Sequence, residues 1–200
     1  MKFALSLALI AAAPLFTNAA PVDNILGQLS ATCKQSLLSI VTGNEPCLPF
    51  SQIWSQTSSI DWENYDSTKV DQYTTLLDTM CSAPRCDKTI TDALATKVRT
   101  ECSEDLSQTV VQILEYAFKN YEPLIAVECA QNSQQQYCLI VEGDELKGHQ
   151  DVDLQDIPNE RLCTDCVQNW VKVYDQYSNS YGDLFANVTD IAQVKERCGY

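Results

Sequence analysis

Ten cysteines constrain the fold of this 200-residue chain more than any other feature. In a secreted protein, an even number of cysteines at this density predicts a disulfide framework rather than metal ligands or reactive thiols. The spacing does not determine the pairing, because eight cysteines alone allow about 105 connectivities. Each disulfide stabilises a fold by about 2–4 kcal/mol. The ten residues, expected to form five disulfides, are Cys33, Cys47, Cys81, Cys86, Cys102, Cys129, Cys138, Cys163, Cys166 and Cys198.

The N-terminus has the features of a secretory signal peptide. Lys2 precedes an apolar run over residues 3–16, and the small residues Ala19 and Ala20 follow. The run is shorter than the about 20 apolar residues that a membrane span needs. We therefore predict a signal peptide over residues 1–19 and a secreted, extracellular mature chain, in a compartment where disulfides persist.

The rest of the sequence indicates no attachment to a membrane. It contains no second apolar stretch of membrane length, and it ends Lys-Glu-Arg-Cys-Gly-Tyr, where a lipid-anchor signal would have a hydrophobic tail. We expect a monomer with neither a transmembrane segment nor a lipid anchor. Asn187-Val-Thr is an acceptor sequence for N-glycosylation, so we expect a glycan on Asn187.

The charge balance excludes nucleic-acid binding. The chain has 13 Lys and Arg against 27 Asp and Glu, for a net charge of −14. Contacts to nucleic-acid phosphates require clustered basic residues, which an acidic chain of this kind does not supply. The same charge opposes docking on an anionic membrane.

Apolar residues recur every three or four positions along most of the chain, which predicts helices. Two-residue alternation is scarce and no Asn-Gly or Asp-Gly turn separates apolar runs, so no hairpin is predicted. We expect an all-α, disulfide-stapled bundle of about six to eight helices. The expected helices include residues 25–41, 68–81, a helix capped by Asp87, a helix opening at Ser103, 160–177 and 183–198.

We expect a single cysteine-rich domain over residues 20–200. Its acidic stretch 142–159 contains two glycines and a proline, which predicts a long exposed loop. This loop separates a core module of residues 21–141 from a C-terminal helical pair at residues 160–200.

Cys163-Thr-Asp-Cys166 has the spacing of a thiol oxidoreductase motif. Those enzymes place it after a strand at the start of a helix, and no strand–helix–strand pattern surrounds it here. We therefore interpret both cysteines as structural. They lie one turn apart on one helix face, so each should pair with a different partner. Together with Cys138 and Cys198 they are expected to staple the C-terminal pair to the rest.

No other pattern indicates an enzyme or a metal site. His149 is the one histidine, which removes most hydrolytic triads. The run from Asp151 to Asp156 resembles a calcium loop at two positions, but Asp156 occupies the glycine position and Leu162 the position of the final glutamate. Neither a Gly-x-Ser-x-Gly elbow nor a phosphate-binding glycine loop is present. We predict no catalytic residues, no cofactor and no metal.

Aromatic residues leave two interpretations open. Trp54, Trp62, Trp170 and nine tyrosines either pack in an ordinary core or line a cavity for an apolar ligand.

Three stretches resemble a family of small fungal secreted cysteine-rich proteins of unknown function. They are Glu45-Pro-Cys-Leu-Pro-Phe-Ser51 followed by Gln56-Thr-Ser58, Tyr121-Glu-Pro-Leu124 through Cys129 to Tyr137-Cys138, and Leu162-Cys-Thr-Asp-Cys166. The resemblance covers nearly the whole mature chain. It implies secretion and an α-helical disulfide fold, and it implies no activity.

Met80-Cys81-x4-Cys86, followed by Cys102 and Cys129, is similar to the second half of the oomycete elicitins, which are helical sterol carriers. This resemblance implies that Cys33 pairs with Cys102, Cys47 with Cys86, and Cys81 with Cys129. In a carrier, a set of apolar side chains would face the ligand cavity: Leu106, Val110, Ile113, Leu114 and Phe118.

Two functional hypotheses follow. The first is a non-enzymatic secreted protein that acts at the fungal surface or towards a host or competitor, with an extracellular protein or cell-wall component as its partner. The alternative is an extracellular carrier of a sterol or fatty acid. An enclosed apolar cavity gains about 0.8 kcal/mol per buried CH₂ group, so it would need no charged residue.

Overall fold

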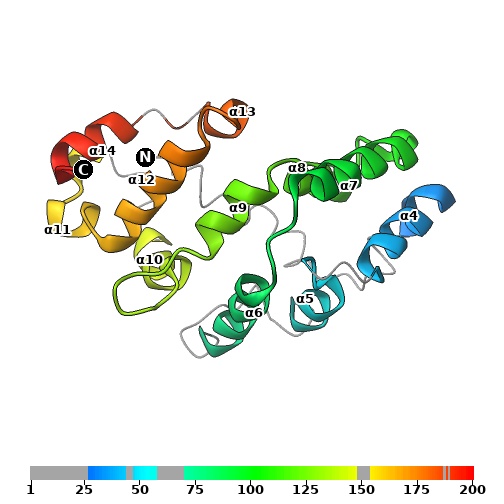
Figure 1. Cartoon of the computed structure of the whole chain (residues 1–200), viewed down its shortest axis with the longest axis horizontal. Coiled ribbons are helices and arrows are strands. Elements are labelled where there is room, and N and C mark those ends of the chain that lie inside the picture. Colours follow the sequence, from blue (N-terminus) through cyan, green and yellow to red (C-terminus); the bar gives the residue numbers. More distant parts are fainter. Residues whose placement is uncertain (1–26, 44–46, 58–69, 148–153, 187, 189) are drawn as a thin grey trace. The chain divides into compact units, whose positions relative to one another are not determined.

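The computed structural model describes residues 27–43, 47–57, 70–147, 154–186, 188 and 190–200. It divides between Glu122 and Pro123 into an N-terminal unit and a C-terminal unit, and Figure 1 colours both along the chain. The signal peptide predicted over residues 1–19 and the glycosylation predicted at Asn187 lie outside the described residues, as do Trp62 and His149.

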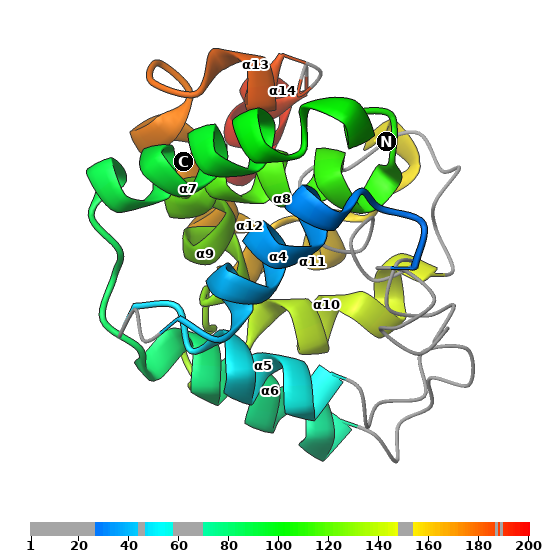
Figure 2. The ribbon, with the colours of Figure 1, turned by 90° about the vertical axis from the view of Figure 1, so that its right-hand side faces the viewer.

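The described part of the N-terminal unit is helical. Helix α7 lies against both α4 and α8, and α5 lies beside α6 (Figure 2). Val98 of α7 and Val111 of α8 are completely buried. The elements are α4 (Ala31–Val41), α5 (Phe50–Thr57), α6 (Val70–Ser82), α7 (Lys88–Glu101), a 3-10 turn (Ser103–Asp105) and α8 (Thr109–Lys119), with α9 (Tyr121–Glu128) containing the boundary between the units.

The C-terminal unit is built around one helix, α12. Trp170 of α12 is buried, and its indole N–H donates to the carbonyl of Val127 at 3.4 Å. Val167, Leu162 and Val194 are buried in the same apolar cluster. The elements are α10 (Cys138–Lys147), a 3-10 turn (Leu154–Asp156), α11 (Asn159–Leu162), α12 (Asp165–Tyr177), α13 (Gly182–Phe185) and α14 (Ile191–Cys198).

The all-α, disulfide-rich fold is confirmed. Within the described ranges there are eleven α-helices, which exceeds the expected six to eight, and no named strand. The number is higher because two expected helices are each divided in two, and because α5, α9 and α10 were not among the expected segments. None of the helices in the part that the structure describes is long and apolar enough to cross a membrane.

Four disulfides join specific elements. Cys33 pairs with Cys102 and Cys47 with Cys86, as the resemblance to elicitins implied. Cys138 pairs with Cys166, and Cys163 pairs with Cys198. Cys163 and Cys166 therefore have different partners, as expected. Cys138–Cys166 joins residues 160–200 to the preceding chain, whereas Cys163–Cys198 lies within that C-terminal segment, so the expectation that it staples the segment to the rest is wrong. Cys81 and Cys129 are also disulfide-bonded, and no described cysteine is a free thiol.

Local capping explains where two helices begin. The carboxylate of Asp87 accepts from the N–H of Thr89 at 2.7 Å, so α7 begins at the residue that the sequence predicted. Helix α4 begins after Ser30, whose hydroxyl accepts from the N–H of Cys33. The N–H of Ser30 donates to both oxygens of the buried Asp105, at 3.1 and 3.2 Å. Asp105 and the Cys33–Cys102 disulfide thus hold the same end of α4.

One expected helix start is wrong. The helix expected to open at Ser103 makes a 3-10 turn there, and α8 begins only at Thr109. Asp105 lies in this turn and accepts from the N–H of Ser30 before α4, so a tertiary contact interrupts the helical pattern.

Three other expected segments also differ. The helix expected over 160–177 is interrupted at residues 163–164, because Thr164 takes an extended backbone and caps α12. Cys163 and Cys166 are therefore not on one helix. The segment 183–198 divides into α13 and α14. Residues 142–147, expected in an exposed loop, continue helix α10.

Arg197 of α14 connects this helix to the segment before α11. Its guanidinium donates to the carbonyls of Leu154 and Ile157, both at 2.6 Å, and to the side-chain oxygen of Asn159 at 2.6 Å. A planar guanidinium has five donors in a fixed fork, so one side chain satisfies three acceptors at once. Arg197 acts as a tie between α14 and residues 154–159.

We expect Arg197→Ala to lower the free energy of unfolding by about 2–3 kcal/mol, because hydrogen bonds from a charged donor are lost and two carbonyls lose their partner. Lys195→Ala on the same helix is the matched control. It removes an exposed ion pair with Asp175, which is worth about 1 kcal/mol or less. Urea denaturation of both variants measures the difference. Equal losses would contradict the role given to Arg197.

Candidate functional site

A tight, exposed turn joins α9 to α10 in the C-terminal unit, and several hydrogen bonds constrain it. Gln131 and Tyr137 form an isolated antiparallel bridge, and the N–H of Cys138 donates to the carbonyl of Ala130 at 2.8 Å. Gln135 takes a positive φ of 61°, the left-handed conformation that usually requires Gly or Asn. A three-residue hairpin loop places a left-handed residue at this position. The structure thus contains a small hairpin where no hairpin signal was found.

The side chain of Asn132 organises this turn. Its oxygen accepts from the N–H groups of Gln134 and Gln136 at 3.0 and 2.9 Å. Its amide nitrogen donates to the side-chain oxygen of Gln136 at 3.0 Å. Asn side chains favour such bonds to nearby backbone groups, which stabilise turns. One asparagine therefore holds both sides of the loop together.

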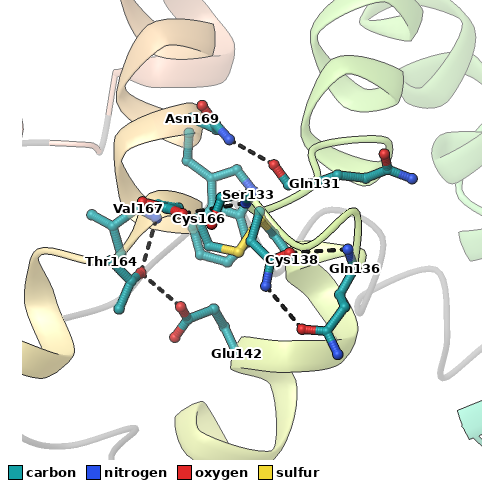
Figure 3. Close-up of a disulfide and its surroundings, with 12 residues drawn as sticks. Gln131, Ser133, Gln136, Cys138, Glu142, Thr164, Cys166, Val167 and Asn169 are labelled. Atoms are coloured by element: carbon teal, nitrogen blue, oxygen red, sulfur yellow. Dashed lines mark hydrogen bonds between the residues drawn. A yellow bond between two sulfur atoms is a disulfide. The ribbon is translucent and has the colours of Figure 1, made fainter.

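The turn is fastened to the start of α12 by three contacts (Figure 3). The N–H of Ser133 donates to the carboxylate of Asp165 at 3.2 Å, and the amide of Asn169 donates to the carbonyl of Gln131 at 2.7 Å. The disulfide between Cys138 and Cys166 links the end of the turn covalently to α12. A disulfide between two hydrogen-bonded contacts leaves the backbone of the turn little freedom relative to α12.

A buried carboxylate lies on the other side of this disulfide. Glu142 of α10 is buried and accepts from the hydroxyl of Thr164 at 2.7 Å, and Figure 3 shows its carboxylate pointing to Thr164. The same hydroxyl accepts from the N–H of Val167 at 3.2 Å and so caps α12. Thr164 both donates and accepts through its hydroxyl, which explains why the chain breaks between α11 and α12.

Two ionisable groups near the turn, Asp165 and Tyr200, have shifted pKa values. Hydrogen bonds from the side chain and backbone of Ser133 hold the pKa of Asp165 below its usual value, with a smaller effect from Lys172. The hydroxyl of Tyr200 donates to the carbonyl of Thr164 at 3.3 Å. Desolvation and the neighbouring Asp165 raise the pKa of this tyrosine. At neutral pH the carboxylate of Asp165 is therefore ionised and the phenol of Tyr200 is neutral.

Glu128, the last residue of α9, is a buried acid with a strongly perturbed titration. Burial raises its pKa from 4.5 to about 8. Desolvation disfavours the charged carboxylate, and among the described residues no basic group offsets that effect. The folded chain therefore holds a neutral carboxylic acid at neutral pH.

A pocket of about 120 Å³ lies in the N-terminal unit. Its walls are largely apolar, with Lys97 among the lining residues. Pockets for drug-sized ligands usually measure about 300–1,000 Å³. The pocket is lined by Ser39, Ile40, Gly43, Leu48, Phe50, Leu94 and Lys97.

The apolar residues named for a carrier cavity do not line this pocket. Phe118 is buried, and its ring meets that of Phe50 edge-on at 5.7 Å. Leu106 is exposed, and the others are partly buried. Of the three tryptophans, Trp170 is a core residue.

The two most distinctive sequence elements meet in the N-terminal unit. The hydroxyl of Tyr121 donates to the carbonyl of Cys47 at 3.2 Å, in a buried position. Burial is the main cause that raises the pKa of Tyr121. Tyr121 of the Tyr-Glu-Pro-Leu element and Cys47 of the Cys-Leu-Pro-Phe-Ser element are thus partners, and this contact gives both a structural role.

We expect Tyr121→Phe to lower the free energy of unfolding by about 1–2 kcal/mol, because the buried carbonyl of Cys47 loses a donor while the ring packing is retained. Tyr116→Phe is the matched control, since the Tyr116 side chain is exposed and its change should cost about 0.5 kcal/mol or less. Thermal denaturation of the two variants checks this. A larger loss for Tyr116→Phe would refute the assignment.

The sequence did not identify the residues that build the turn. Asn132, Ser133 and Gln135 lie in a polar stretch without glycine, and the left-handed residue is a glutamine. Glu142 and Glu128 were not distinguished from the other acids, because burial depends on the tertiary fold. A single signal was available: Asn132, a residue type that favours turns, is the second residue of the polar run between two apolar segments.

Comparison with known proteins places the chain in a family. No curated protein and no solved structure matches it significantly. A family model described as "Domain of unknown function (DUF7729)" matches residues 19–200. The chain therefore belongs to this family, whose model spans nearly the entire sequence.

Proposed function

We propose that this protein is secreted and non-enzymatic, and that it acts by binding a partner at the fungal surface or towards a host or competitor. The observation that carries the proposal is the exposed polar turn at residues 131–137, which a disulfide and side-chain hydrogen bonds hold against α12. Binding residues are often on loops that a rigid scaffold positions. A loop that is already ordered loses little conformational entropy when it binds.

The titration of Glu128 supports an acidic working environment. Between about pH 4.5 and pH 8 the folded chain holds a proton on Glu128 that the unfolded chain has lost. Stability therefore increases as the pH falls through this range. A disulfide-stapled protein with this property suits an acidic, protease-rich exterior.

The proposal is tested in the organism that encodes the protein. N-terminal sequencing of the protein from culture medium should give a chain that begins at Ala20. Deletion of the gene should alter growth, surface properties or infection, while hydrolase activities of the culture filtrate stay unchanged. Normal growth and infection together with a lost hydrolase activity would favour an enzyme instead.

A second candidate is an extracellular carrier of a sterol or fatty acid. It is favoured by the pairs Cys33–Cys102 and Cys47–Cys86, which match the elicitin-like pairing. Organic extraction of protein purified from its native source is the test. A carrier should release a bound lipid and displace a fluorescent sterol or fatty acid, and a clean extract without displacement would exclude it.

A further inference from the structure

The turn at residues 131–136 is an uncharged surface on a strongly acidic protein. Its sequence, Gln-Asn-Ser-Gln-Gln-Gln, contains no ionisable side chain, although the whole chain has a net charge of −14. Five of its six residues are exposed: Gln131, Ser133, Gln134, Gln135 and Gln136. The turn therefore presents amide and hydroxyl groups to solvent.

Three of these amides are available to a ligand. Within the part of the chain that the structure describes, the side chains of Gln131, Gln134 and Gln135 have no hydrogen-bond partner, and Figure 3 shows Gln131 pointing away from the disulfide. Each amide offers two donors and one acceptor oxygen. The contacts that order the turn use the side chain of Asn132 and backbone groups instead. The loop is therefore ordered without using the side-chain amides of Gln131, Gln134 and Gln135 as hydrogen-bond donors or acceptors.

An exposed aromatic ring lies next to the anchor of the turn. Tyr200 is 38% exposed, and its hydroxyl is bonded to the carbonyl of Thr164. The adjacent residue, Asp165, accepts the N–H of Ser133 in the turn. Tyr200 and Ser133 therefore contact consecutive residues at the start of α12. Tyr200 thus offers a partly exposed aromatic ring at the same end of α12 that anchors the amide turn.

We propose that the turn and Tyr200 form a binding surface for a neutral polysaccharide. Amide groups match the hydroxyls of a sugar ring in both donor and acceptor capacity, and an aromatic ring packs on the apolar C–H face of a pyranose. This proposal rests on the proposed function and names the chemistry of the partner.

The net negative charge of the chain and the lack of charge on the turn favour a neutral polymer as the partner. An anionic polymer is repelled by the net charge of −14. A cationic polymer would bind the acidic side chains elsewhere rather than an uncharged turn. A protein partner of standard size needs about 800 Å² on each side with buried aromatic or arginine anchors, which a six-residue amide turn does not supply.

The test uses the mature full-length protein in co-sedimentation with insoluble β-glucan, chitin and cellulose. The Gln134→Ala/Gln135→Gly double variant removes two free amides, and glycine accepts the positive φ of residue 135 without strain. Tyr200→Ala removes the ring, and Tyr200→Phe keeps it. The matched control, Gln72→Ala/Gln176→Ala, changes two exposed glutamines on α6 and α12. Circular dichroism melting of each variant verifies folding.

We expect the wild type to bind at least one of these polymers, with little change between low and high salt because no charge is involved. The Gln134→Ala/Gln135→Gly and Tyr200→Ala variants should each lose at least about tenfold in affinity, whereas Tyr200→Phe and the control bind like the wild type. Binding that is lost in high salt, equal binding by all variants, or no binding would overturn the proposal.

The failure of this inference is distinguishable from failure of the proposed function. A deletion phenotype with a secreted protein that binds none of the polymers would overturn the polysaccharide surface alone. A purified extracellular protein captured through Gln134 and Gln135, without polysaccharide binding, would also overturn it. Absence of the protein from the culture medium would overturn the proposed function itself.

Discussion

The Glu128→Gln variant should gain stability relative to the wild type as the pH rises. The free energy of unfolding of the variant minus that of the wild type should be about 3 kcal/mol larger at pH 7 than at pH 4. Burial raises the pKa of Glu128 in the folded chain from 4.5 to about 8. The wild type loses about 1.4 kcal/mol for each pH unit between these values, because the unfolded chain releases the proton and the folded chain retains it. Glutamine does not titrate, so the variant should lack this slope.

A loss of stability with rising pH is expected only if the pKa of Glu128 is higher in the folded chain than in the unfolded chain. If the pKa of Glu128 in the folded chain were close to its value in the unfolded chain, this residue would add no pH dependence to the free energy of unfolding. Urea denaturation of both proteins at several values between about pH 4 and pH 8 measures the slope. Glu160→Gln, which changes an exposed glutamate of α11, is the matched control and should keep the slope of the wild type. Parallel stability curves for Glu128→Gln and the wild type would contradict the neutral state of Glu128.

Removing the Cys33–Cys102 disulfide with a Cys33→Ala/Cys102→Ala double variant should lower the free energy of unfolding by about 4 kcal/mol. This pair has the largest sequence separation of the four defined disulfides, 69 residues, so it restricts the unfolded chain most. Both sulfurs belong to completely buried cysteines, and alanine leaves no unpaired polar group there.

The location of the loss tests the arrangement of the helices. Hydrogen exchange should increase in α4 and α7, because the disulfide and Asp105 hold the start of α4 together. Removal of Cys138–Cys166, which has a sequence separation of 28, is the comparison. It should cost about 3–4 kcal/mol and increase exchange around the turn at 131–137 instead. The same exchange pattern for both double variants would refute this division of roles.

Local sequence patterns predicted the elements whose ends depend on neighbouring residues. Helix α6 spans Val70–Ser82, close to the predicted 68–81, because its apolar spacing is regular. Helix α7 begins after Asp87 because a side-chain oxygen beside the first N–H groups is a local cap. Both effects act over a few residues, so both can be recognised in the sequence.

The elements that were missed depend on contacts between distant residues. Asp105 interrupts the helix expected at Ser103 because it accepts from Ser30, 75 residues earlier. Thr164 separates α11 from α12 while it donates to Glu142, 22 residues earlier. Gln135 adopts a left-handed backbone that costs about 1–2 kcal/mol for an ordinary residue, and bonds within the turn and to α12 offset that cost. No local pattern contains these partners.

The sequence by itself determined that this is a helical, cysteine-rich chain, because helix periodicity and cysteine content are properties of composition and spacing. Tertiary structure alone decided that Cys138 pairs with Cys166 and Cys163 with Cys198, which acid is neutral and which turn is presented to solvent. Pairing requires two sulfurs to come within bonding distance, and the pKa of Glu128 depends on the water that packing removes. The amide turn is held in place on α12 because this helix supplies Asp165, Cys166 and Asn169 at its base.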